Sequence, residues 1–145
     1  YKESAVEELR LGNERASDID ERIAGILDML NLTDFAQHHP YALSGGQKQR
    51  LTIGTAVASS KPIVVLDEPT SGLDWGNMCA VAQAINQLRE SGRLVFVITH
   101  DIELVDLTAT RVLALAEGRI ADDFPLSSQA ALERTRQIML GGGLL

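Results

Sequence analysis

The sequence is poor in several features that common classes of protein require. Its single cysteine, Cys79, cannot form an internal disulfide, which favours a reducing, cytosolic setting, and no cluster of Cys and His suggests zinc. Aromatic residues make up only 4% of the chain, too few for a platform that stacks nucleic-acid bases. No apolar run approaches the roughly 20 residues that a helix needs to cross a bilayer.

Basic charge is scarce as well. The 145 residues include 13 Lys and Arg against 20 Asp and Glu, a formal net charge of -7. A surface that binds nucleic acid needs clustered Lys and Arg, so we expect no nucleic-acid partner. Hydrophobic residues make up 45% of the chain, which is enough for a core, and the length fits about one domain.

Two short apolar runs predict strands, 63–66 in "KPIVVLDEPT" and 94–99 in "LVFVITHD". Their unbroken apolar character is typical of a parallel sheet that is covered on both faces. Residues 1–43 look helical, and we expect further helices at about 47–59, from Asp74 to Gly92, from Ile102 and over 128–140, with a hairpin of 112–116 and 119–121. Strands that alternate with helices predict an α/β fold.

Polar side chains follow both predicted strands. Asp67 and Glu68 end the first, and His100 and Asp101 follow the second. In open α/β sheets, ligands bind outside the carboxyl ends of the strands, and two acids there are costly without a metal or hydrogen-bond partners. One acid can hold Mg²⁺, through water, while its neighbour faces an attacking water. For Asp101 we expect only a helix cap, because a short helix follows it.

The stretch "ALSGGQKQRL" places two glycines at a predicted helix start. Backbone N–H groups there are unpaired and carry the positive end of the helix dipole. Gly45 and Gly46 have no Cβ, so an anion can come close, and Ser44 and Gln47 add hydrogen-bonding side chains. Two adjacent glycines are more often simply a turn, so this stretch alone is a weak signal.

Three motifs occur in one order: "LSGGQKQR", "IVVLDEPTSGLD" and "VFVITHD". From about Leu43 to Asp101 they resemble the signature, the Walker B strand with its D-loop, and the switch-histidine motif of ABC ATPases. "SGLDWGNM" and "AVEELRLG" resemble energy-coupling-factor and cobalt-type importers. The resemblance implies the C-terminal part of a P-loop NTPase domain. Its helical subdomain would span 1–58, and 59–145 would form the rest of the core with a C-terminal tail.

The resemblance also implies a role for each matching residue. Asp67 would lie near Mg²⁺, Glu68 would polarise the attacking water, and His100 would reach the γ-phosphate. Ser44, Gly45, Gly46 and Gln47 would contact the γ-phosphate of ATP held by the opposite subunit. Ser71, Gly72, Leu73 and Asp74 would form the D-loop across the dimer interface.

The sequence departs from the family pattern in a few places. Trp75 and the pair Gly54-Thr55 are unusual for the family, although neither touches the chemical groups. More important, the 145 residues contain no G-x-x-x-x-G-K-[ST], the loop that cradles phosphates. We therefore expect a C-terminal piece of an ATPase domain that is inactive alone.

The resemblance favours an ATP-hydrolysing transporter subunit that couples ATP and Mg²⁺ chemistry to transport, with a vitamin or a metal ion as possible cargo. Its implied partners are a second ATPase subunit and a transmembrane subunit, on the inner face of the cell membrane. Two alternatives stay open. One is an ABC ATPase of DNA repair or translation; the other is a non-catalytic module that lends its signature motif to a partner ATPase.

Overall fold

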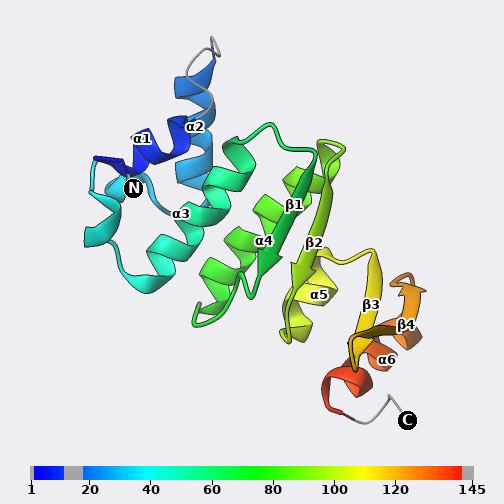
Figure 1. Cartoon of the computed structure of the whole chain (residues 1–145). Coiled ribbons are helices and arrows are strands. Elements are labelled where there is room, and N and C mark those ends of the chain that lie inside the picture. Colours follow the sequence, from blue (N-terminus) through cyan, green and yellow to red (C-terminus); the bar gives the residue numbers. More distant parts are fainter. Residues whose placement is uncertain (1, 12–17, 142–145) are drawn as a thin grey trace. The chain divides into compact units, whose positions relative to one another are not determined.

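The structure is a computed structural model that describes residues 2–11 and 18–141, so the expected tail falls largely outside the described residues. Its elements, shown in Figure 1, are α1 (Ala5–Arg10), α2 (Ile19–Met29), η1 (Thr33–Phe35), η2 (Pro40–Ala42), α3 (Gly45–Ala58), β1 (Ile63–Asp67), α4 (Trp75–Glu90), β2 (Leu94–Ile98), α5 (Ile102–Thr108), β3 (Arg111–Ala116), β4 (Arg119–Pro125) and α6 (Gln129–Met139). The mixed α/β fold is as expected. The chain divides into two compact units, Tyr1–Ile98 and Thr99–Leu145.

Helix α3 lies at the centre of the first unit. It packs against α1 and α2 on one side and against α4 on another, and α4 in turn packs against β2. Large side chains are fully buried in this core, among them Leu9, Leu30, Leu51, Ile53 and Leu88. The predicted boundary between a helical subdomain and a core at 58/59 stays a prediction, because both sides of it lie within one compact unit.

Strands β1 and β2 pair in parallel, with Ile63 opposite Leu94 and Asp67 opposite Ile98. Along β1 burial alternates: Val64 and Leu66 are buried, whereas Val65 is 61% exposed. Side chains in a strand point to opposite faces in turn, and the described helices of the first unit cover only one face. Within the first unit, the expectation of a sheet covered on both faces is therefore wrong.

Gly54, one of the residues that depart from the family pattern, has a packing role in α3. A Cβ on this residue would lie 2.9 Å from Leu9 Cδ2, 3.1 Å from Ile26 Cγ2 and 3.1 Å from Leu30 Cδ1. These three side chains come from α1 and from α2 with its C-cap. The missing side chain lets both helices approach α3 closely, at the usual cost of glycine in a helix.

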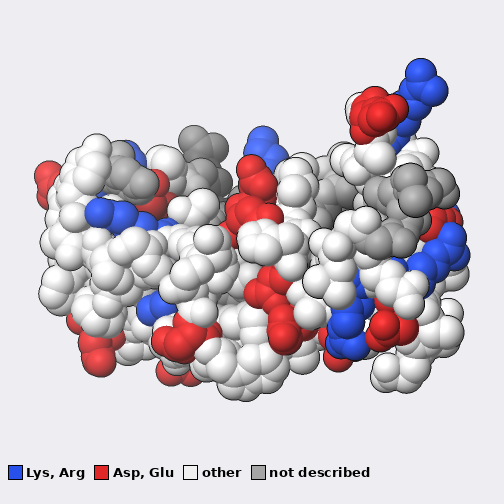
Figure 2. All heavy atoms as spheres, turned by 90° about the horizontal axis from the view of Figure 1, so that it is seen from below, with Lys and Arg blue, Asp and Glu red and all other residues white. Residues whose placement is uncertain are grey.

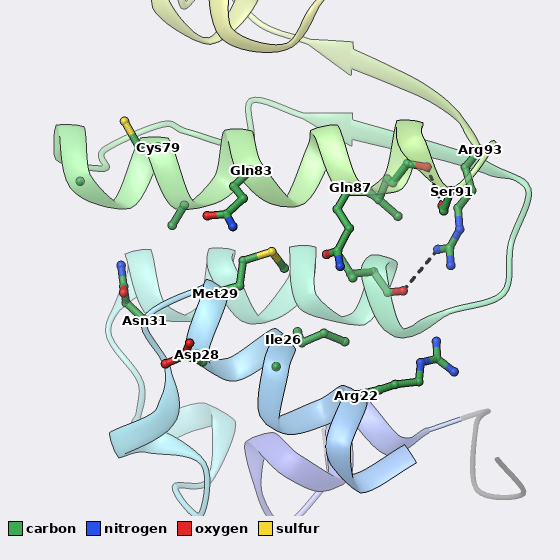
Figure 3. Close-up of a pocket in the computed structure, with 15 residues that line it drawn as sticks. Arg22, Ile26, Asp28, Met29, Asn31, Cys79, Gln83, Gln87, Ser91 and Arg93 are labelled. Atoms are coloured by element: carbon green, nitrogen blue, oxygen red, sulfur yellow. Dashed lines mark hydrogen bonds between the residues drawn. The ribbon is translucent and has the colours of Figure 1, made fainter. Parts of the chain in front are cut away.

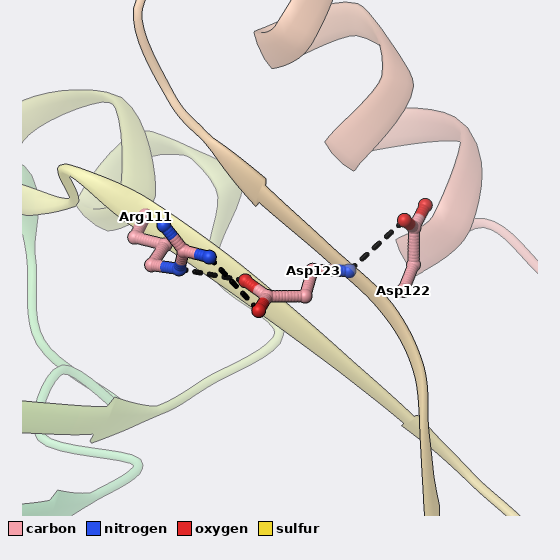
Figure 4. Close-up of polar contacts among 3 residues, drawn as sticks. All are labelled: Arg111, Asp122 and Asp123. Atoms are coloured by element: carbon pink, nitrogen blue, oxygen red, sulfur yellow. Dashed lines mark hydrogen bonds and ion pairs between the residues drawn. The ribbon is translucent and has the colours of Figure 1, made fainter.

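The second unit combines α5, the β3–β4 hairpin and α6. Glu117 and Gly118 both have positive φ, 50° and 74°, which suits the tight two-residue turn that the sequence predicts. Across the hairpin, Arg111 Nε and Nη2 donate to the two carboxylate oxygens of Asp123 at 2.7 and 2.9 Å (Figure 4). Arg134 of α6 pairs with Asp122 and lies over the Phe124 ring, which fastens α6 to the hairpin.

Charged side chains of both signs are interspersed over the face drawn in Figure 2. None of the helices in the described ranges combines the length and the apolar character that crossing a membrane requires.

Gly54 provides a test of the packing around α3. We expect Gly54→Ala to lower the free energy of unfolding by about 1–3 kcal/mol, because the added Cβ overpacks the contact with Leu9, Ile26 and Leu30. Gly25→Ala in α2 is the matched control, since its Cβ would meet nothing within 4 Å. The control should raise stability by up to about 1 kcal/mol through helix propensity. Urea unfolding measures the free energy of unfolding of both variants. An equal increase in that free energy in the two variants would contradict the packing role of Gly54.

Candidate functional site

Helix α3 begins with a capping box. Ser44 Oγ accepts a hydrogen bond from the Gln47 N–H at 3.3 Å, and Gln47 Oε1 accepts one from the Ser44 N–H at 2.8 Å. The helix therefore starts at Gly45, within the two glycines, as the sequence predicts. Both side chains expected to contact a nucleotide have a structural partner, and this alone explains Ser and Gln at this spacing.

The two glycines between them expose backbone amides. Among the described residues, the N–H groups of Gly45 and Gly46 have no acceptor, as is usual for the first positions of a helix. A Cβ on Gly45 would meet nothing within 4 Å, so the space beside it is open. A Cβ on Gly46 would lie 3.0 Å from Leu73 Cδ2, so this glycine serves close packing. The open space beside Gly45 gives an anion a route to these amides.

Asp67 and Glu68 follow one another at the end of β1 but differ in environment. Asp67 is exposed, on the same uncovered face as Val65. Glu68 is half-buried, and its φ of 45° lies in the left-handed region that non-glycine residues rarely adopt. The regular strand conformation therefore ends at Glu68, whose carbonyl accepts the first hydrogen bond of the following turn from the Ser71 N–H. No group of three or more His, Cys, Asp or Glu in the described ranges could hold a metal by itself.

The segment from Ser71 to Asp74 forms a tight turn that leads into α4. The Ser71 N–H donates to the Glu68 carbonyl at 3.2 Å, and the Leu73 N–H donates to the Thr70 carbonyl at 3.0 Å. Gly72 has a φ of 72°, which explains glycine at that position. Asp74 caps α4, as the sequence predicts, by accepting from the Asn77 N–H at 2.9 Å.

Gln49 and Arg50 of α3 join this helix to the end of β1 and to α2. The sequence predicts no role for either residue. Gln49 Nε2 donates to the Glu68 carbonyl at 2.5 Å. Arg50 is buried, and its Nε donates to the Leu30 carbonyl at 2.9 Å. Burial lowers the pKa of Arg50, and the negative charge of Asp74 partly offsets that effect. Both residues belong to "LSGGQKQR". The sequence shows them only as polar side chains inside a predicted helix, and this pattern does not identify their hydrogen-bond partners.

His100 belongs to the second compact unit, whereas Asp67 and Glu68 belong to the first. It is exposed and lies between Ile98, the last residue of β2, and α5. Its predicted role at the γ-phosphate stays a prediction. Asp101 has the expected capping role: its Oδ1 accepts from the N–H groups of Glu103 and Leu104.

The family model described as "ABC transporter" matches residues 2–71. A putative ABC transporter ATP-binding protein of Treponema denticola is 38% identical over 130 residues, which cover 90% of this chain and 26% of the relative. A solved structure of the ATP-binding cassette MJ0796, a dimer in a post-hydrolysis state bound to ADP and Pi, has a TM-score of 0.72 and 31% identity over 86% of this chain. The chain belongs to the ABC transporter ATP-binding family.

The likeness covers most of this chain but only part of each relative. The chain spans 57% of the MJ0796 cassette. A putative HMP/thiamine import ATP-binding protein, YkoD of Bacillus subtilis, is 33% identical over 121 residues, 83% of this chain and 22% of that protein. The fold and the family follow from these likenesses, whereas the activity of a complete ABC protein is a separate question.

This ABC chain also has a cavity of about 760 Å³ between α2 and α4 (Figure 3). At one end, Arg93 donates to the Ala56 and Val57 carbonyls at 3.0 and 3.3 Å, and Arg22 donates to the Ala58 carbonyl at 3.4 Å. The two arginines thus satisfy carbonyls at the negative end of the α3 dipole. None of the predicted site residues lines the cavity, so it is separate from the candidate site.

Asp74 offers a test of the geometry at the start of α4. Its pKa lies below the ordinary 3.8, first because the Asn77 N–H and then because the Asn77 side chain donates to it, with a smaller effect of Arg50. Because the folded pKa is depressed, this stabilisation is present above 3.8 and is lost as pH falls through the folded value. We expect Asn77→Ala to raise the pKa of Asp74, which NMR titration of the carboxylates measures. The loss of folding stability at acid pH should become smaller in the same variant.

Asp123 is the internal control for this titration. Its pKa is also lowered, but by the hydrogen bond from Arg111 in the second unit. Asn77→Ala should leave it unchanged. An Asp74 pKa that does not move would mean that the Asn77 side chain does not stabilise the carboxylate.

Proposed function

We propose that the complete protein is the ATP-hydrolysing subunit of an ABC transporter, and that this chain supplies its signature helix and its magnesium and water ligands. One observation carries the proposal. Two free amides beside the open space at Gly45 lie in the same compact unit as the adjacent acids Asp67 and Glu68. The similar MJ0796 cassette, which is a dimer bound to ADP and Pi, supports the same chemistry.

The residues present fit Mg²⁺ and a phosphate chain. Mg²⁺ is usually held by one or two carboxylates together with waters and phosphate oxygens, which suits an exposed acid such as Asp67 without a protein cage. Bound there, the ion would neutralise charge on the phosphate oxygens. The Gly45 and Gly46 amides fit an anion by the helix dipole and by the absence of a side chain at Gly45.

Each remaining residue would position one group. The Glu68 carboxylate, pointed by its left-handed backbone, would orient and polarise the attacking water. His100 would donate to the γ-phosphate from the loop after β2. Ser44 and Gln47 would mainly hold the helix start in shape, since both side chains are engaged in the capping box. Ser71, Gly72, Leu73 and Asp74 would line the dimer interface as a preformed turn.

The amides of α3 would act on ATP held by a second subunit. Such a division means that the anion cradle of this chain does not need a phosphate-binding loop in its own neighbourhood, and none occurs in its 145 residues. A transmembrane subunit would complete the transporter on the inner face of the membrane. The likeness to the Bacillus protein, a putative HMP/thiamine importer, favours import and a vitamin as cargo.

Glu68 is the decisive residue for hydrolysis. In the complete protein, we expect Glu68→Gln to lower steady-state phosphate release by about 10²–10⁴-fold, because the amide cannot polarise the water, with ATP affinity unchanged. Glu90→Gln, at an exposed acid of α4, is the matched control and should keep normal turnover. Turnover near wild type in Glu68→Gln would remove Glu68 from the mechanism.

The chain of 145 residues tests directly whether its amides and acids need a phosphate-binding loop from outside these residues. We expect it to bind Mg-ATP only weakly and to show no meaningful turnover, because it has no backbone nest and lysine for the phosphates. Calorimetric titration measures the affinity, with a longer chain of the same protein that contains such a loop as the control. Micromolar affinity for the 145 residues alone would refute the proposed division.

A further inference from the structure

The backbone of Glu68 is held at both of its polar groups. Its N–H donates to the Ile98 carbonyl at 2.8 Å, and its carbonyl accepts from the Ser71 N–H at 3.2 Å and from Gln49 Nε2 at 2.5 Å. Two of these partners are main-chain groups of the neighbouring strand and turn. The third, Gln49, is a side chain from another element, α3. It is therefore a contact through which α3 can influence the rare left-handed conformation of Glu68.

The chemistry of the contact fixes how Gln49 must be oriented. A carbonyl oxygen only accepts hydrogen bonds, so the amide nitrogen of Gln49, and not its oxygen, faces Glu68. Gln49 is half-buried and lies in the second turn of α3, close behind the capping box of Ser44 and Gln47. One helix thus presents amides to an anion at its first turn and holds the strand end from its second turn.

Two further contacts connect the same parts of the first unit. Leu73 packs on Gly46, where a Cβ would come within 3.0 Å, and Arg50 interacts electrostatically with Asp74. The start of α3 and the segment 68–74 therefore form one connected assembly. A shift of α3 along its axis would be transmitted to Glu68 through Gln49, because that hydrogen bond joins the helix directly to the Glu68 backbone.

We propose that Gln49 is a positioning residue for hydrolysis: its side-chain amide holds the Glu68 backbone so that the carboxylate points at the attacking water, and so links the helix that binds the partner's ATP to the acid of its own chain. The inference rests on the proposed function, since it assumes that Glu68 acts on water. Gln49 itself touches neither nucleotide nor water. Its effect should appear in the rate of the chemical step and not in ATP binding.

Three substitutions in the complete protein, assembled with its transporter, test this role. Gln49→Leu keeps most of the volume and removes the donor, and we expect kcat for phosphate release to fall about tenfold or more while KM for ATP changes little. Gln49→Lys restores a donor of similar reach, so its kcat should recover most of that loss. Thr52→Val is the matched control, because Thr52 is exposed on α3 and its hydroxyl bonds within the helix, to the Lys48 carbonyl.

ATP-driven dimerisation of the complete ATPase protein without its transporter, measured by light scattering with Mg-ATP, separates a loss of positioning from damage to the helix. Gln49→Leu should dimerise like wild type. A normal kcat in Gln49→Leu would overturn the inference, and so would loss of dimerisation or a failure of Gln49→Lys to recover activity, because either would mean that the substitution acts through the fold of α3.

The Glu68→Gln variant keeps the two proposals distinguishable. If Glu68→Gln retains turnover, the proposed function of Glu68 fails, whatever Gln49 does. If Glu68→Gln abolishes turnover and Gln49→Leu is normal, only the positioning role of Gln49 fails. If both proposals hold, adding Gln49→Leu to Glu68→Gln should lower turnover little further, because the two substitutions affect the same step.

Discussion

Hydrogen bonds from long side chains to backbone carbonyls fix helix α3, and the candidate site depends on where that helix lies. Arg50 holds the end of α2 through the Leu30 carbonyl, and Gln49 holds the end of β1 through the Glu68 carbonyl. At the other end of α3, Arg93 and Arg22 satisfy its last carbonyls. Each bond pairs a carbonyl at the end of a helix or strand, and leaving such a group buried and unpaired costs about 1–3 kcal/mol. The helix therefore has little freedom to slide without breaking several of these bonds.

Much of the fold could be predicted from local signals. Asp74 and Asp101 were recognisable as helix caps, and "EG" as a hairpin turn, because cap and turn chemistry is decided by neighbouring residues. The coverage of the sheet could not be predicted. An apolar run such as Ile63–Leu66 is compatible with one or two covered faces, and the difference depends on which helices pack there. The packing role of Gly54 could not be predicted for the same reason, because it depends on contacts with α1 and α2, which are distant in sequence.

The same distinction between local signals and distant contacts applies to the residues of the candidate site. The sequence predicts which residues would carry the chemistry, because acids after a strand and glycines at a helix start have few other reasons to occur together. It does not identify the residues that position them. Gln49 and Arg50 act on carbonyls of Glu68 and Leu30, which are 19 and 20 residues away along the chain, so no local pattern marks them. Ser44 and Gln47 show the converse: motif and capping box coincide, and the structural role accounts for both side chains.

The energetics of Glu68 explain why its positioning should affect a rate before it affects the fold. A left-handed conformation at a non-glycine residue costs of order 1–3 kcal/mol. The hydrogen bonds that its backbone makes with Ser71, Gln49 and Ile98 each contribute about 1 kcal/mol net. Without Gln49, the two backbone hydrogen bonds still roughly balance the cost of the left-handed conformation, so the turn persists. The backbone of Glu68 is then held in a shallower energy minimum. A carboxylate on a less restrained backbone samples more directions, and catalysis that depends on orientation is sensitive to that spread well before stability is.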